Sequence, residues 1–294
     1  MSDSVLICIP TFQRPKMLKR LLEAIAALDT TVGISVLVAD NDTAQRAGLD
    51  LCLGLEGYRW RLTAVMAPER GIAQARNTLI EYALMSDAAF IAMIDDDEWP
   101  EKNWIEQLLK TAHATGADVV QGSVLFGDHR DIRRPSGRIG LPQGAGNLLI
   151  RRAVLEEMTA PWFDPDFGLS GGEDRDFFVR LKQAGKRFAW SDEARARGTV
   201  PKSRDSLAWR LRRSYSVGNS DMRVLLKHRL TLPQLTAELL KILAALLLSP
   251  LAMVILGLSP NRRAIPLKKL FRAAGKLSAL FGVRTNEYAV IHGE

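Results

Sequence analysis

Three consecutive aspartates, Asp95, Asp96 and Asp97, follow the apolar run 88–94 in this chain. Carboxylates packed this closely repel one another, so the cluster requires a cation or several hydrogen-bond donors to compensate it. Oxygen-only ligands of this kind suit Mg²⁺ or Mn²⁺, which bind one or two carboxylates together with substrate phosphates. The triplet therefore indicates a divalent-cation site, with a solvated acidic turn as the alternative.

A second acidic pair, Glu173 and Asp174, follows Gly171 and Gly172 and precedes a helix-like segment. Glycines allow a backbone to approach a ligand closely. A carboxylate at the start of a helix serves either as a cap or as a general base held against an acceptor hydroxyl. Because the two residues are adjacent, their side chains diverge, and we expect them to have different roles.

Further polar groups follow the first two strand-like segments. The segment 10–14 (Pro-Thr-Phe-Gln-Arg) comes after the first, where a phosphate or a base can approach backbone amides and an arginine. Asp40 ends the second, a position at which α/β folds place a carboxylate that binds a ribose or a base. Arg76 lies on a helix-like segment ahead of the aspartates. The alternatives are a turn or cap for Asp40 and a surface ion pair for Arg76.

Strand-like and helix-like segments alternate through the first half of the chain. The strand-like segments are residues 5–9, 34–39, 59–66, 88–94, 117–126 and 146–150. The helix-like segments are residues 17–28, 45–55, 71–83, 104–115, 152–158 and 174–184. This alternation predicts an α/β domain with a largely parallel sheet. The stretch 127–146, rich in Gly, Pro and Arg, is typical of a binding loop or lid.

The composition is that of a folded protein with one large domain and an appendage. The chain has 294 residues, of which 47% are hydrophobic and 25% are charged. Cys8 and Cys52 have no metal-type spacing, so we expect a reduced chain without structural disulfides. The polar residues before the first strand predict no signal peptide.

The chain has a net charge of +7, and its excess of positive charge lies in the tail. From Leu207 onward the chain has 14 Lys and Arg against 4 Asp and Glu, a balance of +10. The preceding residues have 26 against 29, a balance of −3. Such asymmetry indicates nucleic acid or an anionic membrane surface as a partner.

The hydrophobic pattern of the tail favours the membrane. Residues 242–258 carry no charge, but they include Pro250 and fall short of the roughly 20 residues that a spanning helix needs. After Pro260, Lys268, Arg272 and Lys276 occupy a different face from the apolar residues, as in an amphipathic helix at a membrane interface. We expect re-entrant or in-plane attachment, with a core helix bearing a solvated basic face as the alternative.

Taken together, these segments resemble the GT-A fold glycosyltransferases of the large inverting family 2. The ordered set that carries the resemblance is residues 9–14, 38–41, 71–77, 94–98, 146–147 and 172–174. Within the family, the chain is similar to bacterial enzymes that build exopolysaccharide repeat units on a polyprenyl-diphosphate lipid, as in succinoglycan assembly. The residues 200–204, 209–213 and Gly218 are similar to the C-terminal signature of that subgroup.

The resemblance implies a fold and a reaction. Residues 1–206 would form a GT-A catalytic domain, a mostly parallel sheet with helices on both faces. Residues 207–294 would form a basic, helical, membrane-associating region. The enzyme would move a sugar, expected to come from a UDP-hexose, to a lipid-linked saccharide by a single in-line displacement that inverts the anomeric centre. It would act at the cytoplasmic face of the inner membrane as a peripheral or monotopic protein, with no role for nucleic acid.

The resemblance also implies roles for individual residues. The donor would be bound by Pro10, Thr11, Arg14, Asp40, Arg76 and Asp96. The Mg²⁺ or Mn²⁺ ion would be held by Asp95 and Asp97, with Asp97 preferred as the direct ligand. Asp174 would take the acceptor proton, and the acceptor would be held by Glu173, Gly172 and Asn147.

One feature departs from the family pattern. Many members carry a late His or acidic residue that completes the metal or diphosphate site, and residues 196–201 contain none. We expect Arg204 or Arg210 to stabilise the leaving diphosphate by bidentate contact instead.

Two other functions compete with this interpretation. A non-catalytic membrane scaffold would not need the intact aspartate triplet and the Glu173–Asp174 pair. A sugar-nucleotide pyrophosphorylase would have a Gly-rich, basic loop after the first strand, and the segment 10–14 is not such a loop.

Overall fold

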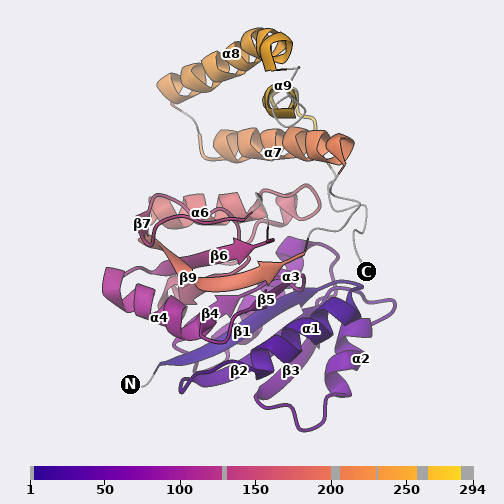
Figure 1. The fold of residues 1–294 in the computed structure, drawn as a ribbon, viewed down its shortest axis with the longest axis vertical. Helices are drawn as coiled ribbons and strands as arrows, with labels where there is room; N and C mark the ends of the chain where they lie inside the picture. Colours follow the sequence, from indigo (N-terminus) through magenta and orange to yellow (C-terminus); the bar gives the residue numbers. More distant parts are fainter. Residues whose placement is uncertain (1–2, 128–130, 200–205, 230, 257–263, 286–294) are drawn as a thin grey trace. The chain divides into compact units, whose positions relative to one another are not determined.

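The computed structural model describes residues 3–127, 131–199, 206–229, 231–256 and 264–285. They form two compact units (Figure 1). Unit 1 comprises the described residues up to 168 together with 176–199, and unit 2 comprises 169–175 and the described residues from 206 to 285. The predicted boundary at 206 and 207 adjoins residues 200–205, which lie outside the described residues.

Unit 1 is built around one mixed β-sheet. Its strands are β1 (Ser4–Thr11), β2 (Gly33–Asp40), β3 (Arg61–Met66), β4 (Phe90–Met93), β5 (Glu98–Pro100), β6 (Val119–Leu125), β7 (Gly137–Ile139), β8 (Leu148–Arg151) and β9 (Phe188–Gly198). Its helices are α1 (Pro15–Ala26), α2 (Ala47–Leu53), α3 (Ile72–Leu84), α4 (Trp104–Thr115), α5 (Arg152–Glu156), the 3₁₀ turn η1 (Pro165–Phe167) and most of α6 (Glu173–Gln183).

The strand order is β3-β2-β1-β4-β8-β6-β9-β5, with β7 paired to β9. The first four strands of that order are parallel, as predicted. Beyond them, β8 runs antiparallel to both of its neighbours, β4 and β6, and β5 and β7 run antiparallel to β9. The expectation of a mostly parallel sheet therefore holds for the half that begins the chain, and the other half is mixed.

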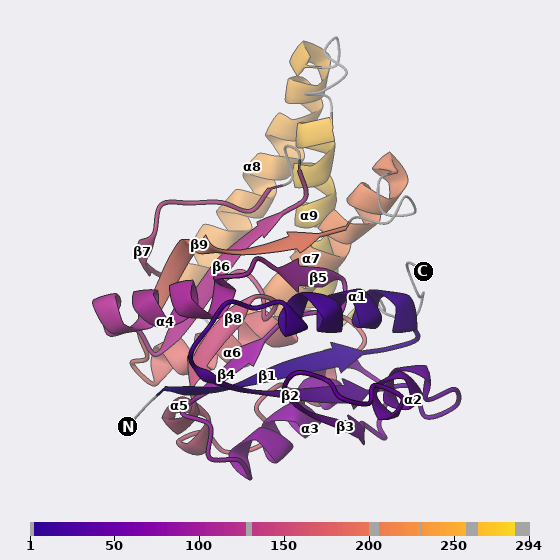
Figure 2. The same ribbon diagram turned by 60° about the horizontal axis from the view of Figure 1, so that its bottom comes forward.

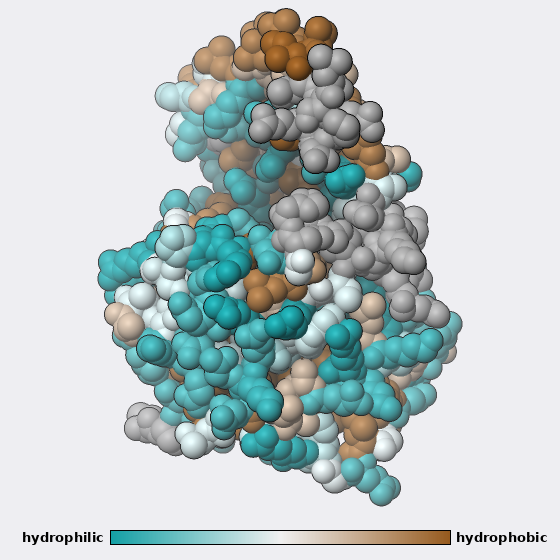
Figure 3. Space-filling view, in the orientation of Figure 1, coloured by the Kyte–Doolittle hydropathy of each residue, from teal (hydrophilic) through white to brown (hydrophobic). Residues whose placement is uncertain are grey.

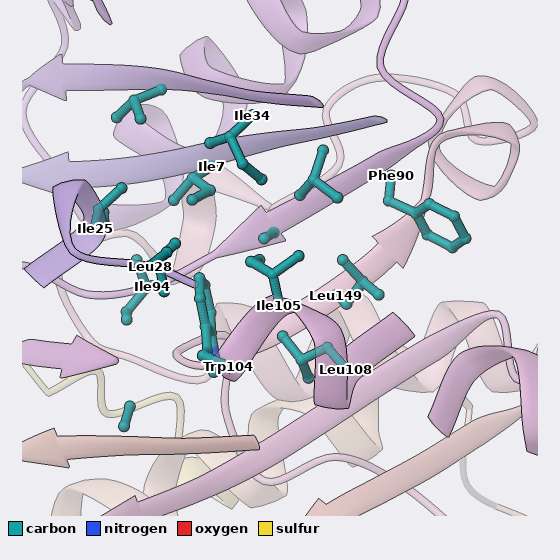
Figure 4. Close-up of a cluster of buried hydrophobic side chains, with 14 of the residues drawn as sticks. Ile7, Ile25, Leu28, Ile34, Phe90, Ile94, Trp104, Ile105, Leu108 and Leu149 are labelled. Carbon is teal, nitrogen blue, oxygen red and sulfur yellow. The ribbon is translucent and has the colours of Figure 1, made fainter. Parts of the chain in front are cut away.

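Helices cover both faces of the sheet. Alternate residues of β1 point to opposite faces, so that Ile7 and Ile9 join one core cluster while Leu6 and Cys8 join the other. The first cluster packs under α1 and α4, and Figure 4 shows Trp104 and Leu108 of α4 among its members. The second packs under α3, α5 and α6. Burial on both faces explains why the strands read as continuous apolar runs.

The two cysteines are free and buried. Burial raises the pKa of the Cys8 thiol far above its usual value. Burial, together with the charge of Asp40, raises the pKa of Cys52 to about 12. Both side chains are therefore neutral, unreactive core residues.

Unit 2 contains three helices, α7 (Leu207–Lys227), α8 (Leu232–Leu256) and α9 (Ala264–Leu280). Within this unit, α9 packs against both α7 and α8, and Figure 2 shows α8 and α9 side by side. The backbones of α7 and α9 meet at two glycines. A Cβ on Gly218 would lie 2.1 Å from the carbonyl oxygen of Arg272, and one on Gly275 would lie 2.0 Å from that of Tyr215. Only glycine permits this approach.

Candidate active site

The polar residues that follow β1, β2 and β4 lie at one edge of the sheet. Thr11, the last residue of β1, is in register with Asp40, the last residue of β2. On the other side of β1, Cys8 is in register with Met93, and the aspartate triplet begins two residues after β4 ends. The carboxyl ends of parallel strands meet at a common edge, where open α/β sheets bind their ligands.

Asp96 is the buried centre of the triplet, with 6% of its surface exposed. It accepts hydrogen bonds from Thr11 Oγ1 at 2.8 Å and from an Arg14 guanidinium nitrogen at 3.0 Å, and the same nitrogen lies 3.1 Å from Asp97 Oδ2. Burial raises the pKa of Asp96 to about 7, with Asp97 and Asp95 adding to the rise, while Arg14 and Thr11 oppose it. The carboxylates in turn raise the pKa of Arg14 despite its burial.

Arg76 compensates the first aspartate of the triplet. Its guanidinium nitrogen lies 3.1 Å from Asp95 Oδ1, and only 4% of the residue is exposed. The guanidinium also lies over the Phe163 ring, 5.4 Å from the ring centroid. The surface ion pair considered from the sequence is therefore partly buried, with Arg76 buried and Asp95 partly exposed, and it involves the first residue of the triplet.

A fourth carboxylate, Glu98, adjoins the triplet. One of its oxygens, Oε2, is buried and has no hydrogen-bond partner among the residues that the structure describes. A Cβ on Gly146 would lie 3.1 Å from Asp95 Oδ2 and 3.2 Å from both oxygens of Glu98. These three oxygens therefore converge on a space that exists because residue 146 is glycine. Burial raises the pKa of Glu98, as do Asp95 and Asp97, with Arg76 opposing.

This arrangement fits a divalent cation. Four carboxylates face two guanidinium groups, which leaves a formal charge of −2 when all of them are ionised. Asp95 Oδ2 and the buried, unpartnered oxygen of Glu98 supply hard ligands of the kind that Mg²⁺ and Mn²⁺ take. In the part of the chain that the structure describes, no three His, Cys, Asp or Glu side chains converge closely enough to hold an ion alone.

Glu98 is a residue to which the sequence interpretation gave no role. It belongs to the segment 94–98 on which the family resemblance rests, but only the three aspartates before it were interpreted as chemical groups of the site. Its position directly after three aspartates was the available signal. Its convergence with Asp95 on Gly146, 48 residues further along the chain, was not visible without the fold.

Asp40 is fully buried at the end of β2. Its Oδ1 accepts a hydrogen bond from the backbone N–H of Asp42 at 3.0 Å, and its Oδ2 accepts from Gly48 and Leu49 at 2.8 and 2.9 Å. These bonds fix the connection from β2 to α2, which is the turn-and-cap role considered from the sequence. The neighbouring Asn41 similarly holds the segment before α3, through Ala67, Glu69 and Gly71.

Asn147 lies in the core rather than at an accessible surface. Its Oδ1 accepts from Trp104 Nε1 at 2.6 Å, and its Nδ2 donates to the carbonyl oxygens of Ser123 and Ala194 at 2.8 and 3.0 Å. The residue has no exposed surface, and both amide hydrogens are used. This geometry gives no support to an acceptor-binding role for its side chain, and we assign it instead to the joining of α4, β6 and β9.

The other predicted acceptor residues, Gly172 and Glu173, and the predicted base Asp174 lie at the start of α6, in the segment counted with unit 2. Gly171 and Gly172 have φ of +74° and +105°, a region that favours glycine. Glu173 begins α6 and is 2% exposed, while Asp174 is partly exposed. Of the predicted diphosphate ligands, Arg210 lies on α7, where its Nε is buried without a hydrogen-bond partner among the described residues. Arg204 lies outside the described residues.

Comparison with known proteins places these features in a family. The family model "Glycosyl transferase family 2" matches residues 6–158. The chain belongs to this family. It is also 33% identical over 235 residues to the succinoglycan biosynthesis protein ExoM of Rhizobium meliloti (strain 1021), which covers 74% of each chain.

Solved structures show the same GT-A fold. The mannosyltransferase PcManGT from Pyrobaculum calidifontis, in complex with GDP-Man and Mn²⁺, has a TM-score of 0.63 at 17% identity, covering 96% of this chain and 88% of that one. Residues 1–349 of S. aureus TarS in complex with UDP have a TM-score of 0.55 at 14% identity, covering 95% and 92%. The predicted fold class, a GT-A α/β sheet followed by an apolar helix, is confirmed.

Proposed function

We propose that this family 2 glycosyltransferase transfers a sugar, with inversion, from a UDP-hexose to a hydroxyl of a lipid-linked saccharide during the synthesis of a bacterial exopolysaccharide or related surface glycan. The observation that carries the proposal is the partly compensated carboxylate cluster at the strand ends of a family 2 domain. The similarity to ExoM supports the exopolysaccharide context.

On the donor side, we assign nucleotide binding to the ends of β1 and β2 and to α3. Pro10, Thr11 and Arg14 follow β1, and Arg14 is already oriented by Asp96 and Asp97. Arg76 is oriented by Asp95 in the same way. Because these cations are fixed before the donor arrives, little reorganisation is needed when a diphosphate binds. Asp40 would contribute by shaping the β2–α2 connection around the base or ribose.

We propose that Asp95 and Asp97, joined by Glu98, hold a Mg²⁺ or Mn²⁺ ion. When bound, the ion would neutralise the charge that develops on the departing nucleoside diphosphate. Arg210, with Arg204, would add donors to the same leaving group.

The acceptor residues would be those at the start of α6. The acceptor hydroxyl oxygen attacks the anomeric carbon as the bond from that carbon to the diphosphate oxygen breaks, and the hydroxyl proton passes to Asp174. Glu173 and Gly172 would hold the acceptor. A single displacement of this kind inverts the anomeric configuration, so an α-linked donor gives a β-glycoside.

The tail would keep the enzyme at the membrane that contains its acceptor. Among the described residues, one helix, Leu232–Ile255, is long and apolar enough to cross a membrane by length and composition, with a mean hydropathy of 2.1. We propose peripheral or monotopic association with the cytoplasmic face of the inner membrane, where anionic lipids attract basic segments by about 1 kcal/mol per cation.

The catalytic assignment is tested with Asp174→Asn. We expect sugar transfer from a panel of radiolabelled nucleotide sugars to lipid-linked acceptors to fall by about 10²–10⁴-fold, the usual contribution of a general base. Binding of UDP, measured by calorimetry, should be retained. Asp50→Asn, an exposed substitution on α2, is the matched control and should transfer normally. Full transfer by Asp174→Asn would exclude Asp174 as the base.

A further inference from the structure

The helix α8 has two sides of different character. Its buried side includes Ile242 and Ser249, and with Ala245 and Leu246 it packs into the small core of unit 2. The opposite side exposes eight large apolar side chains between residues 239 and 255. These are Leu239, Leu240, Leu243, Leu247, Leu248, Leu251, Val254 and Ile255. Figure 3 shows hydrophobic surface gathered over this helix. We call these eight residues the apolar face of α8.

The buried side of α8 is fixed to a charged helix. Lys276 of α9 lies 2.5 Å from Glu238 of α8, and Glu238 also accepts a hydrogen bond from Lys241 at 2.7 Å. Burial acts to raise the pKa of Glu238, but the two lysines outweigh it and the net direction is downward. The carboxylate is therefore ionised, and the pairing ties the first turns of α8 to the last turns of α9.

The helix α9 is in turn fixed to α7. The two backbones meet at Gly218 and Gly275, and Arg272 of α9 lies 2.5 Å from Asp221 of α7. This finding changes the expectation of a freely basic amphipathic helix, because two of the three cations considered from the sequence, Arg272 and Lys276, have carboxylate partners within the unit. The ion pairs of unit 2 thus lie on the side of α8 opposite its apolar face.

We propose that the apolar face of α8 lies in the plane of an anionic lipid bilayer, at the boundary between headgroups and acyl chains, without crossing the membrane. A helix that crossed would carry α9 with it, since the two are paired side by side, and would bring the Glu238–Lys276 pair, Lys268 and Lys269 into hydrocarbon. Charged groups there are costly. Lying in the plane buries the apolar face and leaves α9 and α7 on the aqueous side.

The choice of a lipid partner rests on charge and shape together. The tail carries a balance of +10, which attracts an anionic surface, and the apolar face is continuous along one side of a single helix. Among the exposed residues from 239 to 255, Lys241 alone is charged. This inference rests on the proposed function and deepens it by naming the face of α8 that contacts the membrane and the orientation of that helix, and vesicle binding is measured without any sugar donor. Its failure would therefore leave donor binding by unit 1 unaffected.

The first experiment measures binding of the full chain to vesicles of phosphatidylglycerol and phosphatidylcholine by flotation. Leu247→Glu should weaken binding by about tenfold or more, because a charge replaces a side chain that the bilayer buries. Leu53→Glu is the matched control, since Leu53 on α2 is 68% exposed and Leu247 is 65% exposed. Binding that survives Leu247→Glu at full strength would overturn the proposal.

The second experiment distinguishes lying in the plane from crossing. Leu240→Cys, Leu247→Cys and Val254→Cys lie one heptad apart, so the three positions share a face with a drift of only about 20° per heptad. An environment-sensitive fluorophore on each should report the same shallow depth in lipid-quencher vesicles. A profile that is deepest at 247 and shallow at 240 and 254 would show that α8 crosses, and would overturn the proposal.

A second copy of the chain is the other occupant to be tested. Sedimentation of the parent protein and of Leu247→Glu without lipid should give the same oligomeric state. A parent dimer that Leu247→Glu converts to monomer, together with unchanged flotation, would assign the apolar face to self-association and overturn the lipid proposal.

Discussion

The aspartate triplet is compensated mainly by side chains of the protein itself. Arg14 and Thr11 reach Asp96, Arg14 also reaches Asp97, and Arg76 reaches Asp95. Within the described part of the chain this compensation is incomplete, because Glu98 adds a fourth carboxylate with a buried oxygen that has no hydrogen-bond partner there. A site with residual negative charge and oriented cations can bind both halves of a cation–diphosphate complex. Neither the carboxylates nor the arginines would suffice alone.

The space over Gly146 provides a test of the metal assignment that leaves every carboxylate intact. Gly146→Ala should weaken Mn²⁺ binding in the presence of UDP by about tenfold or more, because the new Cβ would occupy the space on which Asp95 and Glu98 converge. Electron paramagnetic resonance of free Mn²⁺ measures the affinity directly.

Gly140→Ala is the control for this substitution. A Cβ there would meet nothing within 4 Å, and the residue does not have a positive φ, so Mn²⁺ binding should be unchanged. Equal affinities in both variants would place the ion away from Gly146 and remove Glu98 from its ligand set.

At the scale of elements, a single buried amide joins two strands of the mixed half of the sheet to α4. Asn147 precedes β8 with φ of +49° and contacts α4, β6 and β9 through one side chain. Gly122 is fitted to it, because a Cβ at residue 122 would lie 2.5 Å from Asn147 Oδ1. The side chain of Asn147 therefore fixes α4, β6 and β9 next to Gly146, the residue that lies against the carboxylates of Asp95 and Glu98.

We expect Asn147→Ala to lower the free energy of unfolding by about 3 kcal/mol, since three hydrogen bonds of about 1 kcal/mol each are lost and their partners stay buried. Urea denaturation followed by tryptophan fluorescence measures the change. Asn103→Ala is the control, because Asn103 is exposed and its side chain caps no helix bond. A stable Asn147→Ala protein that loses only acceptor affinity would support the acceptor-binding role predicted from the sequence.

Some elements could be predicted from the sequence and others could not. β1, β2 and β4 are buried on both faces and therefore read as apolar runs, which is why they were predicted. β9 was not predicted, because Asp192, Glu193, Arg195 and Arg197 interrupt its apolar pattern. β5 and β7 have three residues each, too few to give a period.

The site shows the same limit. The residues at the ends of β1, β2 and β4 were proposed as site residues because ligands bind where parallel strands end. Which arginine pairs with which aspartate was not predictable, because Arg14 and Arg76 are 82 and 19 residues from their partners Asp96 and Asp95. The burial of Asn147 could not be predicted for a related reason. The sequence shows that a residue is polar, but it does not show whether the fold satisfies its hydrogen bonds internally.

At the scale of the whole molecule, the charge is unevenly distributed along the chain. Residues 1–206 are slightly acidic, with a balance of −3, and residues 207–294 are basic, with a balance of +10. Such a division orients a protein near an anionic surface before any contact forms. The apolar face of α8 would then supply the short-range part of the attachment.

Salt separates these two contributions. Raising NaCl from about 0.1 M to about 1 M shortens the Debye length from about 10 Å to about 3 Å, so binding to phosphatidylglycerol vesicles should weaken several-fold. Binding to pure phosphatidylcholine vesicles, measured in the same flotation assay, should be weaker at low salt and should show little salt dependence. Identical salt profiles for the two lipids would remove the electrostatic part of the attachment.

The glycine contacts of α7 and α9 bear on the segment ahead of the proposed base. Ser170 accepts hydrogen bonds from Arg223 and Ser220 of α7 at 2.6 and 3.3 Å, and Arg175 lies 3.3 Å from Asp221, which also holds Arg272 of α9. Asp174 therefore belongs to the same compact unit as the helix that bears the apolar face. With α8 bound to a bilayer, the dimensions of this unit would set the distance between Asp174 and the membrane surface. Asp174 would then lie at a fixed distance from the lipid phosphates. Only an acceptor sugar with a hydroxyl at that distance would receive the transferred sugar.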